Sequence, residues 1–214
     1  MNGTAPVGIL GGTFDPMHAG HLALAQEALR QLHLSCVLLI PAGGPWQRTP
    51  QAPPLDRLEM VRRAVGQMPG LQVDDREVRR KGPTYTIDTL RELRAEWGND
   101  RPLWLILGAD AFLRLPTWHR WQELLDLVHL AVFCRPGSSL SADSMPLALR
   151  REFERRCCDP GQAQGSGGAI AICRMPLLEI SATQIRNALR AGQFPADLLP
   201  PAVLDYIETH QLYR

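Results

Sequence analysis

The sequence predicts an α/β fold: a Rossmann-like doubly wound parallel sheet with a small helical C-terminal extension. Two observations support this prediction. Short apolar runs alternate with helical patterns along the chain, which is the order of a βαβα fold with right-handed crossovers. The runs are apolar on both faces, as are the strands of a parallel sheet that helices cover on both sides.

Five apolar runs are expected to be strands, and most of the stretches between them helices. The strands are Val7–Leu10, Cys36–Ile40, Leu103–Leu107, Leu130–Cys134 and Ile170–Cys173. The helices are expected at about 18–33, 54–66, 86–97 and 119–127, with a last one at Ala202–His210.

Three other stretches show no helical or strand pattern. The charged run Asp74–Lys81 is expected to be a solvated strand edge and loop. Residues 150–160 are expected to be irregular, and the glycine-rich stretch 162–168 a mobile connection.

Doubly wound sheets bind ligands beyond the carboxyl ends of their strands, where the strand order reverses. The turn at Gly11 and the loops at Pro41 and Gly108 each follow a predicted strand. We therefore expect these three segments to open onto one cleft.

Length and composition fit one globular domain. The chain has 214 residues, of which 45% are hydrophobic and 21% charged, with a net charge of +1. We expect a single domain over 1–214, with an α/β core at about 1–178 and a helical part at about 179–214.

Composition also excludes several classes of partner. A net charge near zero supplies no basic field for nucleic acid, and no apolar run is as long as a membrane span. The five cysteines are odd in number and lack zinc spacing. We expect a cytoplasmic protein with reduced thiols that acts on small molecules.

The segment Val7–Leu29 carries the strongest signal for function. It reads VGILGGTFDPMHAGHLALAQEAL, with Gly11 and Gly12 after the first predicted strand. Asp15 suits a helix N-cap and Pro16 the first helical position, so we expect the helix to begin there.

Two histidines follow this expected helix start. His18 and His21 lie three residues apart and would share one helix face. Free N–H groups at a helix N-terminus attract anions, so the combination predicts a polyphosphate site. The histidine pair alone would also fit a surface pair or a weak metal site.

A second helix start lies late in the chain. Residues 180–186 read ISATQIR, in which Ser181 and Gln184 fit a capping box. Capping leaves Arg186 unexplained, because a cation early in a helix opposes the helix dipole. Its presence indicates a bound anion.

Other segments have both a structural and a functional interpretation. Asp110 follows a strand in Gly108-Ala109-Asp110 and fits either a helix cap or a ribose contact. The stretches 82–90 (GPTYTIDTL) and 115–121 (LPTWHRW) fit turns with core aromatics. Trp118 lies beside charged residues, so it could instead stack on a flat heteroaromatic ring.

These segments together resemble the H-x-G-H nucleotidyltransferase superfamily. GGTFDPMHAGH resembles its signature, and ISATQIR resembles I-S-S-T-x-I-R. TYTIDTL and PTW resemble S-Y-T-x-x-T-L and P-T-W. Within the superfamily, nearly the whole chain most resembles bacterial nicotinate-nucleotide adenylyltransferases, which implies adenylyl transfer from ATP to nicotinate mononucleotide with release of pyrophosphate.

The resemblance also implies which residues bind each substrate. For ATP they are Gly11, Gly12, Thr13, Phe14, His18, His21, Gly108, Asp110, Ser181, Thr183 and Arg186. His18, His21 and Arg186 would be the catalytic groups. For the acceptor they are Arg48, Tyr85, Thr86, Trp118, His119 and Arg135.

The implied acceptor contacts differ in kind. Trp118 would stack on the pyridine ring, and backbone N–H groups near Thr86 and His119 would hold its carboxylate. Arg135 would meet the acceptor's phosphate. One loop departs from the pattern, because WQR at 46–48 replaces the P-H-K of many relatives; Arg48 keeps the positive charge and is expected to face the cleft.

The implied reaction needs no general base, because a phosphate with a second pKa of about 6 is already largely ionised. Mg²⁺ is expected to bind through the ATP phosphates and water, without a protein ligand. Two alternatives stay open: another H-x-G-H transferase, with a nicotinamide mononucleotide or pantetheine-phosphate acceptor or with cytidylyl transfer, and a non-catalytic nucleotide-binding protein.

Overall fold

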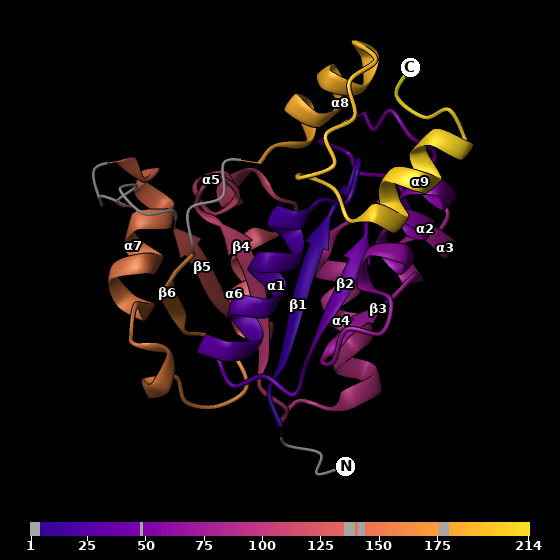
Figure 1. The fold of residues 1–214 in the computed structure, drawn as a ribbon. Coiled ribbons are helices and arrows are strands. Elements are labelled where there is room, and N and C mark those ends of the chain that lie inside the picture. The colour runs from indigo at the N-terminus through magenta and orange to yellow at the C-terminus, as the bar shows by residue number, and fades with distance from the viewer. Residues whose placement is uncertain (1–4, 48, 135–139, 141–143, 176–179) are drawn as a thin grey trace.

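An all-parallel sheet lies at the centre of the fold (Figure 1). The structure, a computed structural model, describes residues 5–47, 49–134, 140, 144–175 and 180–214. Within these residues the sheet has six strands in the order β3-β2-β1-β4-β5-β6, which confirms the predicted doubly wound arrangement. The strands are β1 (Val7–Gly12), β2 (Cys36–Pro41), β3 (Leu71–Val73), β4 (Leu103–Gly108), β5 (His129–Cys134) and β6 (Ile170–Arg174).

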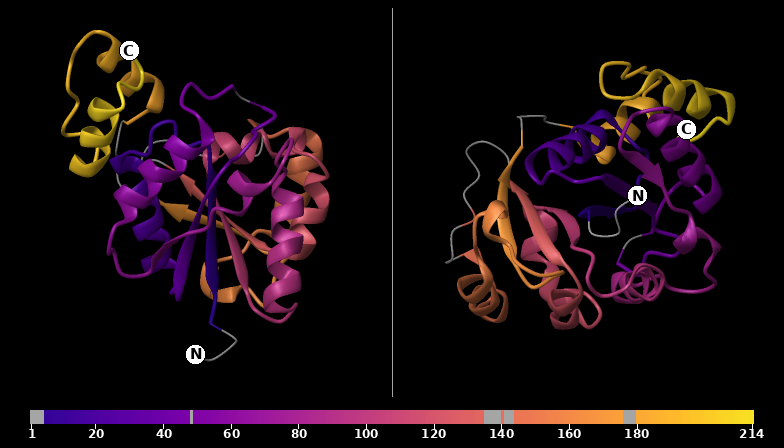
Figure 2. Two further views of the ribbon diagram at one scale, coloured as in Figure 1. Left: turned by 90° about the vertical axis from the view of Figure 1, so that its right-hand side faces the viewer. Right: turned by 90° about the horizontal axis from the view of Figure 1, so that it is seen from below.

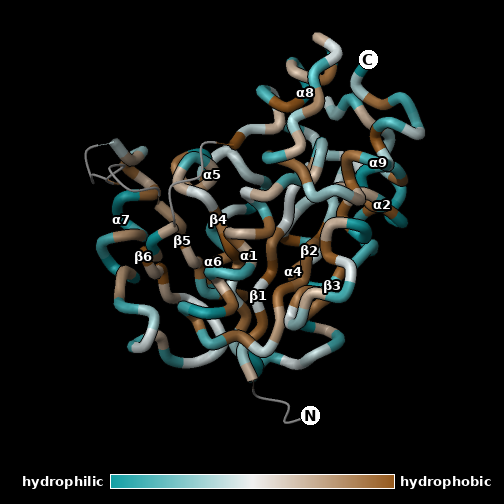
Figure 3. Tube along the Cα trace, viewed as in Figure 1, coloured by the Kyte–Doolittle hydropathy of each residue, from teal (hydrophilic) through white to brown (hydrophobic). Residues whose placement is uncertain are grey.

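Helices cover both faces of this sheet (Figure 2). In one hydrophobic cluster the sheet packs against α1 (Ala19–Gln31), α2 (Pro54–Val65), α8 (Ala182–Arg190) and α9 (Pro201–Thr209). In the other cluster it packs against α4 (Thr86–Trp97), α5 (Ala109–Leu113), α6 (Trp121–Leu127) and α7 (Leu147–Arg156). Figure 3 shows mostly apolar strands at the centre, surrounded by helices in which polar and apolar residues alternate.

The register of the sheet opens a crevice at the switch point. Strands β1 and β4 pair only where Val7–Ile9 meets Leu103–Leu105. Both strands run three residues further, to Gly12 and Gly108. The carboxyl ends of β1 and β4 are therefore not paired with each other. This agrees with the prediction that the segments after these strands open onto one cleft.

Two segments are more regular than the sequence predicted. The run Asp74–Lys81 contains a short helix, α3 (Arg76–Arg79), in which Glu77 is buried. Residues 150–156 belong to α7 and are therefore not irregular, whereas residues 157–159 are in neither a helix nor a strand. Both segments are rich in charged residues and so lack a clear helical pattern of apolar residues. Ion pairs stabilise them instead: α3 pairs with α4 through Arg76 and Glu96, and α7 has a pair one turn apart, Arg156 with Glu152.

The glycine-rich stretch 162–168 is a connection, as predicted, but backbone hydrogen bonds hold it. The carbonyl of Ser166 accepts from the N–H of Leu103 at 3.2 Å and from Arg94 Nη2 at 2.8 Å. The N–H of Gly168 donates to the carbonyl of Val128 at 3.0 Å. The loop therefore closes the end of the sheet opposite the crevice.

The first helix begins later than predicted. Its N-cap is His18, not Asp15, and the peptide bond between Asp15 and Pro16 is cis. The buried carboxylate of Asp15 instead accepts from the backbone N–H groups of Gln51 (2.8 Å) and Ala52 (3.1 Å) and from the Tyr213 hydroxyl (2.8 Å). Long-range donors thus outcompete the local cap.

None of the helices in the described residues is long and apolar enough to cross a membrane.

Candidate active site

A cavity of about 410 Å³ lies in the crevice between β1 and β4. Its walls come from the carboxyl ends of both strands, from the loop after β2, from the start of α4, from the segment around α5, and from the start of α8. The three loops predicted to share a cleft all contribute to it, through Gly11, Ala42 and Gly108.

The two early histidines stack on each other, but only one lines the cavity. The ring centroids of His18 and His21 lie 3.6 Å apart, with 19° between the planes. His21 lines the cavity, whereas His18 is buried behind it at the helix N-cap. His18 therefore supports the ring of His21, and His21 is the imidazole that can meet a ligand.

Gly20 leaves room for this stack. A Cβ at that position would lie 3.2 Å from Nδ1 of His18, closer than ordinary van der Waals contact. Steric crowding by the His18 ring thus favours glycine at position 20, which the spacing of the two histidines alone does not reveal.

The tautomer of His21 follows from its backbone contact. The N–H of His18 donates to Nδ1 of His21 at 3.3 Å, so the neutral ring carries its proton on Nε2. Burial, together with the neighbouring His18, lowers the pKa of His21 well below its usual 6.5. His21 is therefore a neutral hydrogen-bond donor at neutral pH.

Arg186 enters the cavity from the other end of the chain, on the second turn of α8. Its Nη1 donates to the carbonyl of Asp15 at 2.6 Å, and its Nη2 to the hydroxyl of Thr183 at 3.2 Å. Its buried Nε has no hydrogen-bond partner among the described residues. These two hydrogen bonds orient the guanidinium, the carboxylate of Asp15 lies 3.9 Å from Nη1, and Nε remains as a donor for a ligand.

The N-terminus of α8 agrees with the predicted capping. Ser181 is the N-cap, and its hydroxyl accepts from the N–H of Gln184 at 3.2 Å. Ser181 and Thr183 line a separate depression beside α8, not the cavity that contains His21.

An aromatic cluster forms the opposite wall. Tyr85, His119 and Trp46 lie together, with ring centroids of Tyr85 and His119 4.5 Å apart and those of Trp46 and Tyr85 6.2 Å apart. Trp118 is half-buried and lines the same cavity. A flat ring could stack against these aromatic side chains, close to the free backbone N–H groups at the start of α4.

Most of the predicted site residues meet at this cavity. Those that line it are Gly11, Gly12, Thr13, Phe14, His21, Tyr85, Thr86, Gly108, Trp118, His119 and Arg186. His18 and Asp110 belong to neighbouring segments but do not line it. Arg48 and Arg135 lie outside the described residues.

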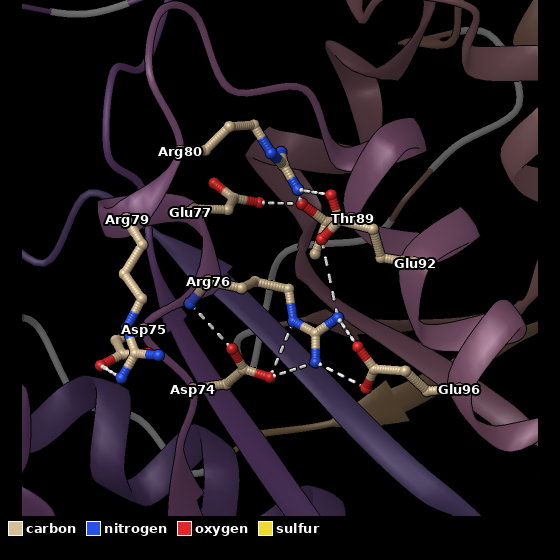
Figure 4. Close-up of polar contacts among 9 residues, drawn as sticks. All are labelled: Asp74, Asp75, Arg76, Glu77, Arg79, Arg80, Thr89, Glu92 and Glu96. Carbon is tan, nitrogen blue, oxygen red and sulfur yellow. Dashed lines mark hydrogen bonds and ion pairs between the residues drawn. The ribbon is translucent and has the colours of Figure 1, made fainter.

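No pattern in the sequence indicated that this cavity has a polar floor. Glu77, Thr84 and Thr89 all line it and are at least nine-tenths buried. The Thr89 hydroxyl donates to Glu77 at 2.6 Å (Figure 4). Burial raises the pKa of Glu77. The Thr84 hydroxyl lies beside Glu77 and offsets part of this rise.

Ion pairs fix α3, which carries Glu77, against α4 (Figure 4). Arg76 contacts Asp74 at 2.8 Å and Glu96 at 3.0 Å. Arg80 reaches Glu92 at 2.7 Å. The floor and the start of α4 therefore form one unit.

Comparisons with known proteins agree with this geometry. The profile of the family described as cytidylyltransferase-like matches residues 9–188. The protein named "Probable nicotinate-nucleotide adenylyltransferase" of Pseudomonas fluorescens is 49% identical over 211 residues, which cover 97% of each chain. The protein of the same name from Dechloromonas aromatica is 47% identical, and the match covers 98% of each chain.

Solved structures support the fold independently. Plasmodium falciparum nicotinic acid mononucleotide adenylyltransferase complexed with NaAD has a TM-score of 0.75 at 16% identity, over 98% of this chain and 97% of that one. The structure titled "The Crystal Structure of a Putative Nicotinate-nucleotide Adenylyltransferase from Vibrio parahaemolyticus" has a TM-score of 0.65 at 17% identity, over 99% of this chain and 96% of that one. The chain therefore belongs to the cytidylyltransferase-like family and, within it, to the nicotinate-nucleotide adenylyltransferases.

Proposed function

We propose that this protein transfers the adenylyl group of ATP to nicotinate mononucleotide, which yields nicotinate adenine dinucleotide and pyrophosphate. Relatives that share nearly half of its residues carry the name of this enzyme. The observation that carries the proposal is one cavity, at the switch point of the sheet, with phosphate-binding groups on one wall and aromatic rings on the other.

The reaction is a displacement at the α-phosphorus of ATP. A phosphate oxygen of the acceptor forms the new bond, and the bond from the α-phosphorus to the bridging oxygen breaks. The electron pair leaves with pyrophosphate. The acceptor phosphate is already ionised at neutral pH, so the protein's task is to align the two anions and stabilise the developing charge.

In this proposal His21 and Arg186 serve the ATP phosphates. His21 donates from Nε2 without needing to be protonated, because its Nδ1 already accepts the N–H of His18. Arg186 supplies its free Nε–H and its charge. The backbone at Gly11 and Gly12 allows a phosphate to approach closely.

The acceptor occupies the aromatic wall. Trp118 stacks on the pyridine ring, and the N–H groups at the start of α4, near Thr86, hold its carboxylate. Tyr85 and His119 pack beside this subsite. Arg48 and Arg135 are proposed as further acceptor contacts on sequence grounds alone.

Mg²⁺ fits this site as a companion of ATP. In the part of the chain that the structure describes, no cluster of three or more histidine, cysteine or carboxylate side chains could hold a metal. The cavity wall near His21 and Arg186 offers hydrogen-bond donors and a cation, which bind phosphate rather than metal. Bound through the phosphates and water, the ion would neutralise charge on the triphosphate.

We also propose that the protein works in the cytoplasm, since its five cysteines are free thiols, as is usual in a reducing compartment.

Pyrophosphate release tests the function directly. Purified protein is given ATP with nicotinate mononucleotide, nicotinamide mononucleotide or phosphopantetheine, and in parallel CTP in place of ATP. We expect release with ATP and nicotinate mononucleotide, together with the dinucleotide product. Faster release with another acceptor or with CTP would assign a different transferase, and ATP binding without release for every acceptor would indicate a non-catalytic protein.

A further inference from the structure

A buried arginine joins the loop after β1 to the loop after β2, and both loops contribute to the cavity. Arg57 lies on α2 and is 0% exposed. Its Nη1 donates to the carbonyl of Thr13 at 2.7 Å, and its Nη2 to the carbonyl of Gly43 at 3.2 Å. Its Nε donates to the carbonyl of Ala52 at 3.2 Å. One planar guanidinium thus joins the loop after β1 to the loop after β2 and to the residues just before α2.

Burying the Arg57 guanidinium costs free energy, which indicates that its bridge between the two loops has a role. Burial lowers the pKa of Arg57, and the charge of Asp15 offsets part of this effect. Arg57 makes its hydrogen bonds with neutral carbonyls rather than with a carboxylate. Removing a charge from water in this way costs free energy. The neighbours of Arg57 on α2, Leu58 and Met60, avoid this cost because their buried side chains are apolar.

The loop at Thr13 belongs to the ATP side of the cavity. Thr13 and Phe14 both line it, next to His21. The carbonyl of Asp15, two residues on, accepts the hydrogen bond that orients Arg186. A displacement of Thr13 would therefore move the groups proposed to hold the triphosphate.

The loop at Gly43 belongs to the acceptor side. A Cβ on Gly43 would lie 2.0 Å from the carbonyl oxygen of Glu77, so this loop is in close contact with α3. The carbonyl of Gly44 accepts from the N–H of Thr84 at 3.0 Å, just before Tyr85 and the start of α4. Gly43 thus sets the position of the acceptor wall.

The ladder between β1 and β2 ends before these loops diverge. Its last contact is the N–H of Ala42, which donates to the carbonyl of Gly12 at 2.9 Å. One residue further along each strand, Arg57 bridges Thr13 and Gly43.

We propose that Arg57 is a positioning residue that fixes the separation of the ATP and acceptor subsites, and so aligns the acceptor phosphate with the α-phosphorus. This proposal rests on the proposed function. The reacting atoms must approach to about 3–3.5 Å, and a misplacement of about 1 Å can lower the rate about 100-fold. A lysine at this position keeps the charge, but its single nitrogen cannot take the places of the three guanidinium nitrogens that reach Thr13, Gly43 and Ala52.

The test compares Arg57→Lys with Arg62→Lys, a matched control on the exposed face of the same helix, where Arg62 is paired with Asp75. For each variant kcat is measured, together with the separate Kd values for ATP, nicotinate mononucleotide and the dinucleotide product. The product links both halves covalently, so its affinity reports the separation of the subsites.

We expect Arg57→Lys to lower kcat about 100-fold and to weaken the dinucleotide at least tenfold. The Kd for each separate substrate should change less than threefold, and Arg62→Lys should match the wild type. Wild-type kcat in Arg57→Lys, or a parallel loss of all three affinities, would overturn the proposal. If the lysine variant does not fold, Arg57→Gln is measured against the same criteria. A wild-type protein that never releases pyrophosphate would instead refute the proposed function.

Discussion

The contact between the backbone of His18 and the ring of His21 leads to a sharp prediction about His21. Because Nδ1 accepts the N–H of His18, only Nε2 can donate toward the cavity. The amide nitrogen of a glutamine can take the place of Nε2, whereas the shorter asparagine reaches only the place of Nδ1. His21→Gln should therefore keep the donor that His21→Asn and His21→Ala lose.

The magnitude follows from the role of a preorganised donor. Removal of one such donor typically costs about 2.7–4 kcal/mol of transition-state stabilisation, a factor of about 100–1,000 in kcat. We expect a loss of that size in His21→Asn and His21→Ala. We expect His21→Gln to lose about tenfold, because its flexible side chain lacks the stacking of His21 on His18.

The assay is steady-state pyrophosphate release with ATP and nicotinate mononucleotide, with the thermal midpoint measured for each variant. The matched control is His33→Gln, because His33 is exposed beyond the end of α1. Its kcat should equal the wild-type value. If His21→Asn were as active as His21→Gln, the tautomer argument would be refuted, and wild-type turnover in His21→Ala would remove His21 from the mechanism.

Three further predictions follow from other contacts. Burial lowers the pKa of His18 to about 4, below its unfolded value, so the contribution of His18 to stability is complete above about pH 6.5 and falls as the pH drops. In urea unfolding the wild type should lose about 2–3 kcal/mol more than His18→Asn between pH 7 and 4.5, and equal losses would contradict this. Trp118→Ala should raise KM for the acceptor about tenfold and leave KM for ATP unchanged, with Trp118→Phe close to the wild type; equal effects on both substrates would exclude stacking on the acceptor ring. Tyr213→Phe removes the hydrogen bond to buried Asp15 and should lower the free energy of unfolding by about 1–3 kcal/mol in urea titrations; an unchanged midpoint would show that this bond contributes nothing.

Much of the fold could be predicted from local patterns. The strands of the sheet centre and the helices at 54–66 and 86–97 have apolar faces that repeat with the right period, and the structure places α2 and α4 there. The short β3 and α3 were missed. Three or four residues carry too little periodicity, and α3 is held by Arg76 and its partners on α4.

The start of α1 shows why local capping rules failed at one point. Asp15 and Pro16 form a typical helix start in sequence. The carboxylate of Asp15 instead accepts from Gln51, Ala52 and Tyr213, which lie 36 or more residues away. A single sequence contains no trace of such partners.

Some residues of the candidate site could also be predicted from the sequence, and others could not. The motif with His21 and the late arginine, Arg186, could be predicted to meet because both fit anion sites at helix starts. Arg57 and Glu77 could not, because each is an ordinary charged residue within a charged stretch. Only the fold shows that both are buried beside the cavity.

The measurement that tests the central claim most directly is a crystal structure of the protein with a non-hydrolysable ATP analogue and nicotinate mononucleotide. We predict that the triphosphate lies in the cavity between β1 and β4, within hydrogen-bond distance of Nε2 of His21 and of Arg186, with the pyridine ring on Trp118. A triphosphate seated in the separate depression lined by Ser181 and Thr183, with the cavity at His21 free of nucleotide, would contradict the account.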